Sequence, residues 1–195
     1  MKFGKPIAIL LIVCFVASLA AATVIPKGGN GSKRDKNMDI QNIKVFSSAF
    51  ESNSSIPRKY TCNAENINPP LEFEGIPKEA KSLALIIEDS DAPMKVFTHW
   101  IVWNIAPIAK IDEDSMPGIE GINDFRKIGY GGPCPPSGTH RYFFRVYALD
   151  KQLGIKAGTS RKKLESEMKG HIVAKGELMG KYSKSIVYLP ALPLR

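Results

Sequence analysis

The sequence predicts a mainly β domain. Its apolar runs are short and rich in β-branched and aromatic residues, as half-buried strands usually are. Turns rich in proline, glycine and asparagine separate these runs, for example at 66–70 and 116–118. A chain of 195 residues with 44% hydrophobic and 24% charged residues can bury a sizeable core, so we expect one globular domain.

Four segments carry the strand pattern. Residues 43–46 predict an opening strand, and residues 82–88 predict a buried strand whose apolar run ends at charge. Residues 96–105 and 142–149 predict two more strands. The loop before the last strand, 129–138, contains four glycines and three prolines, so it can be neither a helix nor a central strand.

One segment, 159–175, has the periodicity of an amphipathic helix. Thr159 or Ser160 could be its N-cap. Its apolar face, at positions i, i+4 and i+8, consists of Leu164, Met168 and Ile172. We expect this helix to pack on the sheet, and we expect His171 within it to be structural or exposed.

The N-terminal residues differ from the rest of the chain. Lys2 and Lys5 precede an apolar run over 7–22, and three alanines at its end offer a cleavage site. Counted through Ile25, about 19 largely apolar residues could span a bilayer. Residues 1–25 are therefore predicted to be a signal peptide or an uncleaved N-terminal membrane anchor, and both alternatives stay open.

The next residues, 26–38, are rich in glycine, lysine and asparagine and predict a flexible linker. The folded domain is expected to cover 39–195. We expect the protein to be exported, and either secreted or tethered to the outer face of the cytoplasmic membrane.

Export changes the interpretation of the three cysteines. Cys14 lies within the apolar N-terminal run, which leaves Cys62 and Cys134 in the domain. These two could form a disulfide or remain buried free thiols, because spacing alone does not show whether their Cα atoms come close.

The formal net charge is +8, or +6 without Lys2 and Lys5. The basic residues are scattered rather than arranged in a stripe with aromatic residues, so we expect no nucleic-acid partner. A basic exterior favours encounter with anionic ligands or surfaces, phospholipid headgroups in particular.

Acidic and imidazole side chains stand next to the predicted strands. Asp89 and Asp91 directly follow the buried strand, where they could line a pocket or only accept backbone N–H groups in a turn. His99 and His140 each open an apolar run, and the 129–138 loop delivers His140 and Tyr142 to the start of a strand. This arrangement can build one small polar pocket at the edge of the β-core.

Several motifs follow one another in a distinctive order: Ile56-Pro57-Arg58-Lys59-Tyr60-Thr61-Cys62, Asn68-Pro69-Pro70-Leu71, Asp89-Ser90-Asp91-Ala92-Pro93, Thr98-His99-Trp100, Gly131-Gly132-Pro133-Cys134-Pro135-Pro136-Ser137-Gly138, His140-Arg141-Tyr142 and Gly176-Glu177-Leu178-Met179-Gly180. Over about 43–182 the sequence resembles the phosphatidylethanolamine-binding protein family, in its bacterial and archaeal branch. The resemblance implies a Greek-key antiparallel β-sandwich with peripheral α-helices, and a pocket that accepts phosphate or a phosphorylated headgroup.

The resemblance also assigns residues to that pocket. The positions that match the family's pocket are Asp89, Asp91, His99, His140 and Tyr142. The glycine- and proline-rich loop of the family also contributes, which adds Gly131, Gly132 and Pro133. The commonest family form has proline where this chain has Ser90, a departure that we expect to loosen the turn.

We therefore expect an exported, non-catalytic module that binds a small anion, with no cofactor and no metal. Nearby carboxylates should favour the imidazolium forms of His99 and His140, Tyr142 adds an O–H donor, and the glycine loop can offer N–H groups. Phosphate should then bind more strongly at mildly acidic than at alkaline pH.

Two other classes remain as alternatives. A hydrolase could use His99, His140 and an aspartate as acid and base or as metal ligands, but no nucleophile motif is present. Some members of the family inhibit serine proteases or kinases, so a protein target is an alternative partner, although no inhibitory loop is identifiable.

Overall fold

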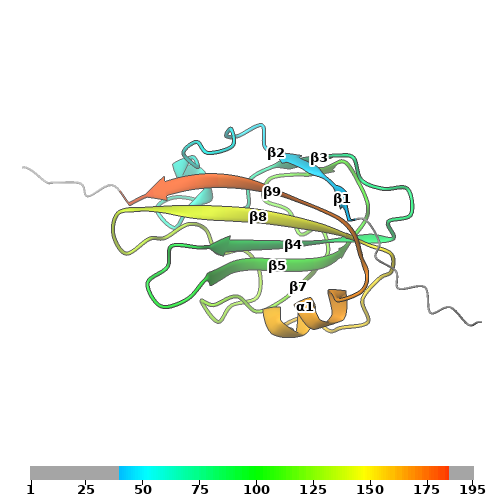
Figure 1. Ribbon diagram of the computed structural model, residues 1–195. Helices are drawn as coiled ribbons and strands as arrows, with labels where there is room; N and C mark the ends of the chain where they lie inside the picture. Colours follow the sequence, from blue (N-terminus) through cyan, green and yellow to red (C-terminus); the bar gives the residue numbers. More distant parts are fainter. Residues whose placement is uncertain (1–39, 185–195) are drawn as a thin grey trace, which may run out of the picture. The chain divides into compact units, whose positions relative to one another are not determined.

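The computed structural model describes residues 40–184. The predicted leader, 1–25, and the predicted linker, 26–38, lie outside these residues. Within them, the strands form two sheets (Figure 1). The larger has six strands, in the order β1 (Gln41–Asn42), β9 (Ile172–Ser183), β8 (Thr139–Leu149), β4 (Ser82–Asp89), β5 (Phe97–Ile105) and β7 (Ile119–Glu120). The smaller has three, β2 (Lys44–Phe46), β3 (Leu71–Glu74) and β6 (Lys110–Ile111).

Both sheets are almost wholly antiparallel, since only β1 pairs in parallel, with β9. The prediction of a mainly β fold is confirmed, whereas the Greek-key connection stays a prediction. The helices within 40–184 are one α-helix, α1 (Arg161–Met168), and one 3-10 turn, Arg58–Tyr60. None of the helices in this range is long and apolar enough to cross a membrane.

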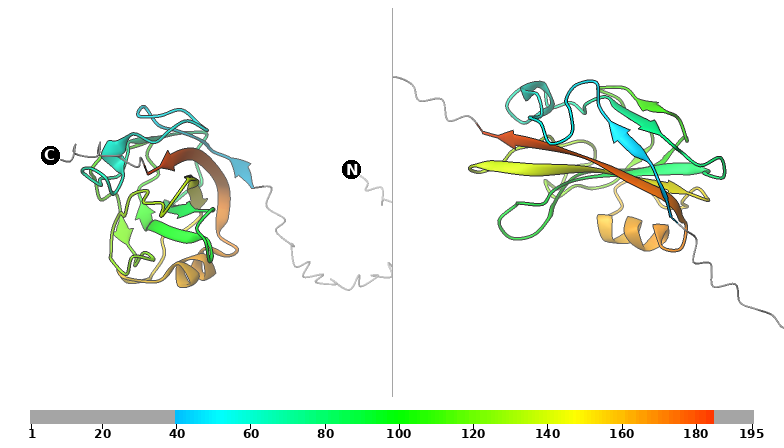
Figure 2. Two further views of the ribbon diagram at one scale, coloured as in Figure 1. Left: turned by 90° about the vertical axis from the view of Figure 1, so that its left-hand side faces the viewer. Right: turned by 45° about the horizontal axis from the view of Figure 1, so that its top comes forward.

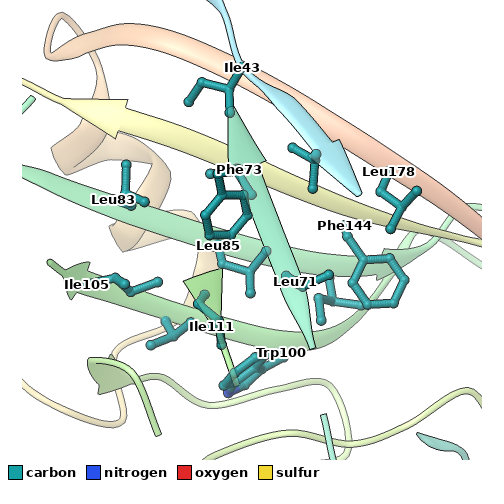
Figure 3. Packing of buried hydrophobic residues seen from close by; sticks show 14 of the residues in the cluster. Ile43, Leu71, Phe73, Leu83, Leu85, Trp100, Ile105, Ile111, Phe144 and Leu178 are labelled. Carbon is teal, nitrogen blue, oxygen red and sulfur yellow. The ribbon is translucent and has the colours of Figure 1, made fainter. Parts of the chain in front are cut away.

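The main core lies between the two sheets. Figure 3 shows Leu71 and Phe73 of β3 beside Leu83 and Leu85 of β4, with Trp100 of β5 close by. These side chains are all buried. Burial of large apolar side chains is the main favourable term in folding, at about 1.5–3 kcal/mol for each, so this interface is the main source of stability.

A second core covers the opposite face of the large sheet. Ala84 and Ile86 of β4 pack with Leu164 and Met168 of α1, and Figure 2 shows α1 on the side of the sheet away from the small sheet. Because both faces are covered, all eight residues of β4 are buried. Successive β4 residues alternate between the two cores.

The predicted helix is confirmed only in its first half. Leu164 and Met168 are buried as expected, but α1 ends at Met168 and Ile172 begins β9. Gly170 adopts a left-handed backbone with φ of 80°, a conformation that ends helices and is accessible to glycine at little cost. The expected strands are confirmed at 82–88, 96–105 and 142–149, and 43–46 corresponds to β2.

Candidate functional site

One end of the large sheet brings together side chains from three strands. Asp89 is the last residue of β4, and its register partners are Phe97 on β5 and Tyr142 on β8. His99 and His140 lie within two residues of these partners. In Figure 1 this is the left-hand end of β4, β5 and β8. Strand pairing therefore places the residues near each other, although they are far apart in the sequence.

Asp89 is buried and is engaged on both carboxylate oxygens. Its Oδ2 lies 2.7 Å from Nδ1 of His140, which is also buried. Its Oδ1 accepts the backbone N–H of Asp91 at 2.9 Å. The carboxylate thus stabilises the turn and also orients an imidazole ring, so it does more than accept backbone N–H groups.

His99 is 2% exposed and has a different partner. Its Nδ1 lies 2.6 Å from the carbonyl oxygen of Gly131, so Nδ1 carries the proton and donates it. The ring packs edge-on against Tyr142 and Phe125, with 5.2 Å between centroids in each pair. Burial is the largest influence on this group and lowers the pKa of His99. The expected imidazolium form is therefore wrong for free His99, because burial outweighs the nearby carboxylate.

Asp91 lies in the turn that follows β4 and forms an ion pair with Arg141. Two guanidinium nitrogens of Arg141 donate to its carboxylate at 2.9 and 2.6 Å, and the Arg141 backbone N–H donates at 2.9 Å. The hydrogen bonds from the Arg141 side chain are the main reason that the pKa of Asp91 falls to about 2. Asp91 is therefore ionised and already paired with Arg141, and it is not among the residues that line the cavity described below.

Ser90 connects this turn to β8 through its backbone, and the expectation of a looser turn stays a prediction. Its backbone N–H donates to the carbonyl oxygen of Arg141 at 3.2 Å. Proline has no N–H and could not make this bond. Serine at this position therefore adds a connection between the turn and β8.

Tyr142 is fully buried, and no residue of the described chain lies at hydrogen-bonding distance and angle from its hydroxyl. Burial, followed by the nearby Asp89 carboxylate, raises the pKa of Tyr142, so the phenol stays protonated. An unpaired buried hydroxyl costs about 1–3 kcal/mol. Tyr142 thus places its protonated hydroxyl beside the Asp89 carboxylate and packs its ring against His99.

A cavity of about 200 Å³ opens next to these groups. Asp89 and His99 supply its polar wall. The other residues that line it are Ala92, Pro93, Phe97, Phe125, Cys134 and Pro136. Cys134 is joined to Cys62 by a disulfide, which resolves the alternative between a bridge and free thiols and ties the cavity wall to the segment after the 3-10 turn.

The glycine loop does not provide the expected N–H donors, and this prediction is wrong. The N–H of Gly131 donates to the carbonyl oxygen of His99 at 3.0 Å, and that of Gly132 donates to Oδ1 of Asn66 at 2.7 Å. A Cβ on Gly131 would lie 2.6 Å from the Phe125 ring, so close packing explains the glycine. Both glycines line a separate hollow of about 300 Å³, and Pro133 lines neither space.

Sequence reasoning missed the aromatic walls of the cavity. Phe97 lies two residues before His99, so strand alternation could have placed both on one face. Phe125 lies in an irregular segment with no pattern that marks it. Within residues 40–184, no three side chains of the metal-binding types are placed to hold an ion, so His99, His140 and Asp89 do not form such a group.

Comparisons with known proteins agree with this architecture. A family model described as phosphatidylethanolamine-binding protein matches residues 46–183. The chain is 47% identical over 178 residues to a UPF0098 protein of Pyrococcus horikoshii, covering 85% of this chain and 87% of that protein. It is also 47% identical over 151 residues to a UPF0098 protein of Methanothermobacter thermautotrophicus, covering 73% and 99%.

Two crystal structures are similar to the described fold. A putative phosphatidylethanolamine-binding protein homologue from Chlamydia trachomatis has a TM-score of 0.72 and 41% identity, with 74% of this chain and 99% of that chain covered. Escherichia coli YbcL has a TM-score of 0.68 and 26% identity, with 73% and 99% covered. From its motifs, its fold and these relatives, the chain belongs to the phosphatidylethanolamine-binding protein family, in the bacterial and archaeal branch.

Proposed function

We propose that this protein binds a small phosphate-bearing molecule, either a free organic phosphate or a phospholipid headgroup, without turnover. The observation that carries the proposal is the cavity that joins a buried carboxylate, Asp89, to a buried imidazole, His99. At about 200 Å³ it suits a small polar group rather than a lipid with its chains.

The two polar groups suit the two ends of a zwitterion. The Asp89 carboxylate attracts an ammonium group. His99 has its Nδ1 committed to Gly131, so only Nε2 can contact a ligand. Neutral Nε2 is an acceptor and becomes a donor only when the ring is protonated, so binding of a phosphate at this point takes up a proton. Phosphoethanolamine carries both charges and is the natural first probe.

A hydrolase remains the alternative that a specific observation favours. The Asp89–His140 contact of 2.7 Å has the geometry with which a carboxylate orients a catalytic base. Turnover of phosphoethanolamine or of a phosphodiester would replace the binding proposal by this one. Inhibition of a serine protease or kinase stays a prediction with no surface assigned to it.

We also propose that the protein acts outside the cytoplasm, secreted or tethered to the outer face of the membrane. The N-terminal sequence pattern supports this location. The Cys62–Cys134 disulfide supports it independently, because such bonds persist mainly in oxidising compartments.

Calorimetric titration of the purified protein with phosphate and phosphoethanolamine tests the binding proposal. His99→Asn retains an N–H that can reach Gly131 but removes Nε2, and should weaken binding about tenfold or more, as expected for loss of a hydrogen bond to a charged group. His171→Asn is the matched control, because His171 also bonds through Nδ1, to Asp150 at 2.8 Å, outside the cavity. Absence of binding by the folded wild type, or equal affinities in both variants, contradicts the proposal.

A further inference from the structure

An exposed apolar groove of about 400 Å³ lies on the β4–β5 loop. The residues that line it are Ala92, Pro93, Met94, Lys95 and Phe97. Met94 is 97% exposed, and Val96 beside it is also exposed. Met94 is the most exposed large apolar side chain within residues 40–184, and it lies in a hollow of apolar side chains, which makes this loop a candidate site of interaction.

This groove adjoins the proposed ligand cavity. Ala92, Pro93 and Phe97 line both spaces. Phe125, which is 39% exposed, packs edge-on against Phe97 with 4.8 Å between ring centroids and also lines the cavity. We call Pro93, Met94, Val96, Phe97 and Phe125 the mouth rim.

Basic side chains lie next to the mouth rim. Lys95 lines the groove and pairs with Asp124 at 3.0 Å. Arg126 and Lys127 directly follow Phe125 on an exposed turn, and no carboxylate of residues 40–184 forms a salt bridge with either. Apolar side chains flanked by long basic ones match the boundary between acyl chains and anionic headgroups in a bilayer.

We propose that the mouth rim docks on an anionic phospholipid bilayer, with Met94 and Phe125 inserted at the interface and Arg126 and Lys127 on the headgroups. This inference rests on the proposed function, because docking would bring a lipid headgroup to the cavity. A headgroup that keeps its acyl chains can enter a cavity of about 200 Å³ only from the membrane surface, so the apolar rim has to meet the bilayer. An anionic bilayer explains why basic side chains lie next to the apolar rim, whereas a soluble peptide would not require them.

The test uses a probe local to the rim, because the N-terminal apolar run of the full chain could bind membranes by itself. Met94→Trp is compared with Met116→Trp in full-length protein added to vesicles whose acyl chains are brominated and quench tryptophan. Met116 is 72% exposed, and it precedes Ile119, which pairs with Trp103 about 20 Å along β5 from Phe97. Trp100 and Trp103 are buried and give the same background in both variants.

On vesicles of phosphatidylcholine, phosphatidylethanolamine and phosphatidylglycerol, quenching of Met94→Trp should exceed that of Met116→Trp several-fold. Arg126→Ala and Lys127→Ala, each added to Met94→Trp, should lower the quenching reached at saturating lipid and low salt by about twofold or more, because each removes a contact that holds the rim on the bilayer. Lys81→Ala, before the opposite end of β4, should leave that quenching unchanged. Equal quenching of Met94→Trp and Met116→Trp overturns the docking surface.

Two further arms separate this inference from the proposed function. Vesicles without phosphatidylethanolamine test whether the headgroup contributes, and vesicles without phosphatidylglycerol test the basic residues. Soluble phosphoethanolamine is titrated against the same variants, which should bind it as wild type does because position 94 lies outside the cavity lining. Rim quenching without soluble binding supports docking and contradicts the proposed function, whereas soluble binding without rim quenching does the reverse.

Discussion

His99 and His140 are both buried and both bonded through Nδ1, yet their partners differ. His140 faces the carboxylate of Asp89, whereas His99 faces the uncharged carbonyl of Gly131. A neutral carbonyl stabilises a buried positive charge less than a carboxylate does. Burial is therefore the main influence on His99, and it lowers the pKa of the ring. The sequence shows that two histidines stand before apolar runs, but it does not show which partner each one meets.

The lowered pKa of His99 predicts the pH range in which binding changes. The free ring stays neutral below the ordinary histidine pKa of about 6.5, so affinity for phosphoethanolamine should rise as pH falls through that value, by up to about tenfold per pH unit. Acidification has the opposite effect on the stability of the ligand-free protein. The His99 ring takes up a proton at higher pH in the unfolded chain than in the folded one, so the free energy of unfolding falls as pH falls through this range.

Calorimetry in two buffers of different ionisation enthalpy checks this prediction. The wild type should take up protons on binding, and His99→Asn should take up fewer. Affinity that does not change with pH, together with no proton uptake, would show that His99 does not face the phosphate.

Adjacent residues at the end of β4 serve opposite faces of the large sheet. Asp89 lines the cavity, whereas Glu88 is 4% exposed and meets Arg145 at 2.7 Å and Arg161 at 2.5 Å. Arg161 begins α1, so Glu88 connects the helix to the strand that carries Asp89. Alternation along a strand predicts this division, but the sequence alone does not identify the arginines.

Glu88→Ala should lower the free energy of unfolding by about 2–3 kcal/mol, somewhat less than for a fully buried ion pair because both arginines are partly exposed. Glu165→Ala is the matched control, since Glu165 pairs with the same Arg161 at 2.7 Å but its side chain is 47% exposed. Its loss should cost below about 1 kcal/mol. Urea denaturation of both variants measures the difference, and equal losses would show that the Glu88 network contributes no more than a surface pair.

The secondary structure was predictable wherever one pattern dominated. An unbroken apolar run predicts a buried strand such as β4. The boundary between α1 and β9 could not be predicted in this way, because Leu164, Met168 and Ile172 keep helical spacing across Gly170. Since a single left-handed residue ends the helix, periodicity extended it too far.

Across the molecule, the mainly β architecture and the clustering of Asp89, His99, His140 and Tyr142 follow from patterns and ordered motifs. The small sheet was harder to predict, because β3 and β6 are short and their burial depends on the large sheet opposite. The cavity wall was harder still. Phe125 reaches it from an irregular segment, and Cys134 is held there through a bond to a residue 72 positions away.

The most direct test of the central claim is an imidazole NMR titration of the tag-free protein with phosphoethanolamine. The chain has three histidines, so each can be assigned and one serves as an internal control. The resonances of His99 and His140 should shift together along one saturation curve while those of His171 stay fixed. Unmoved His99 resonances at saturating ligand, or shifts at His171 alone, would contradict a phosphate site in this cavity.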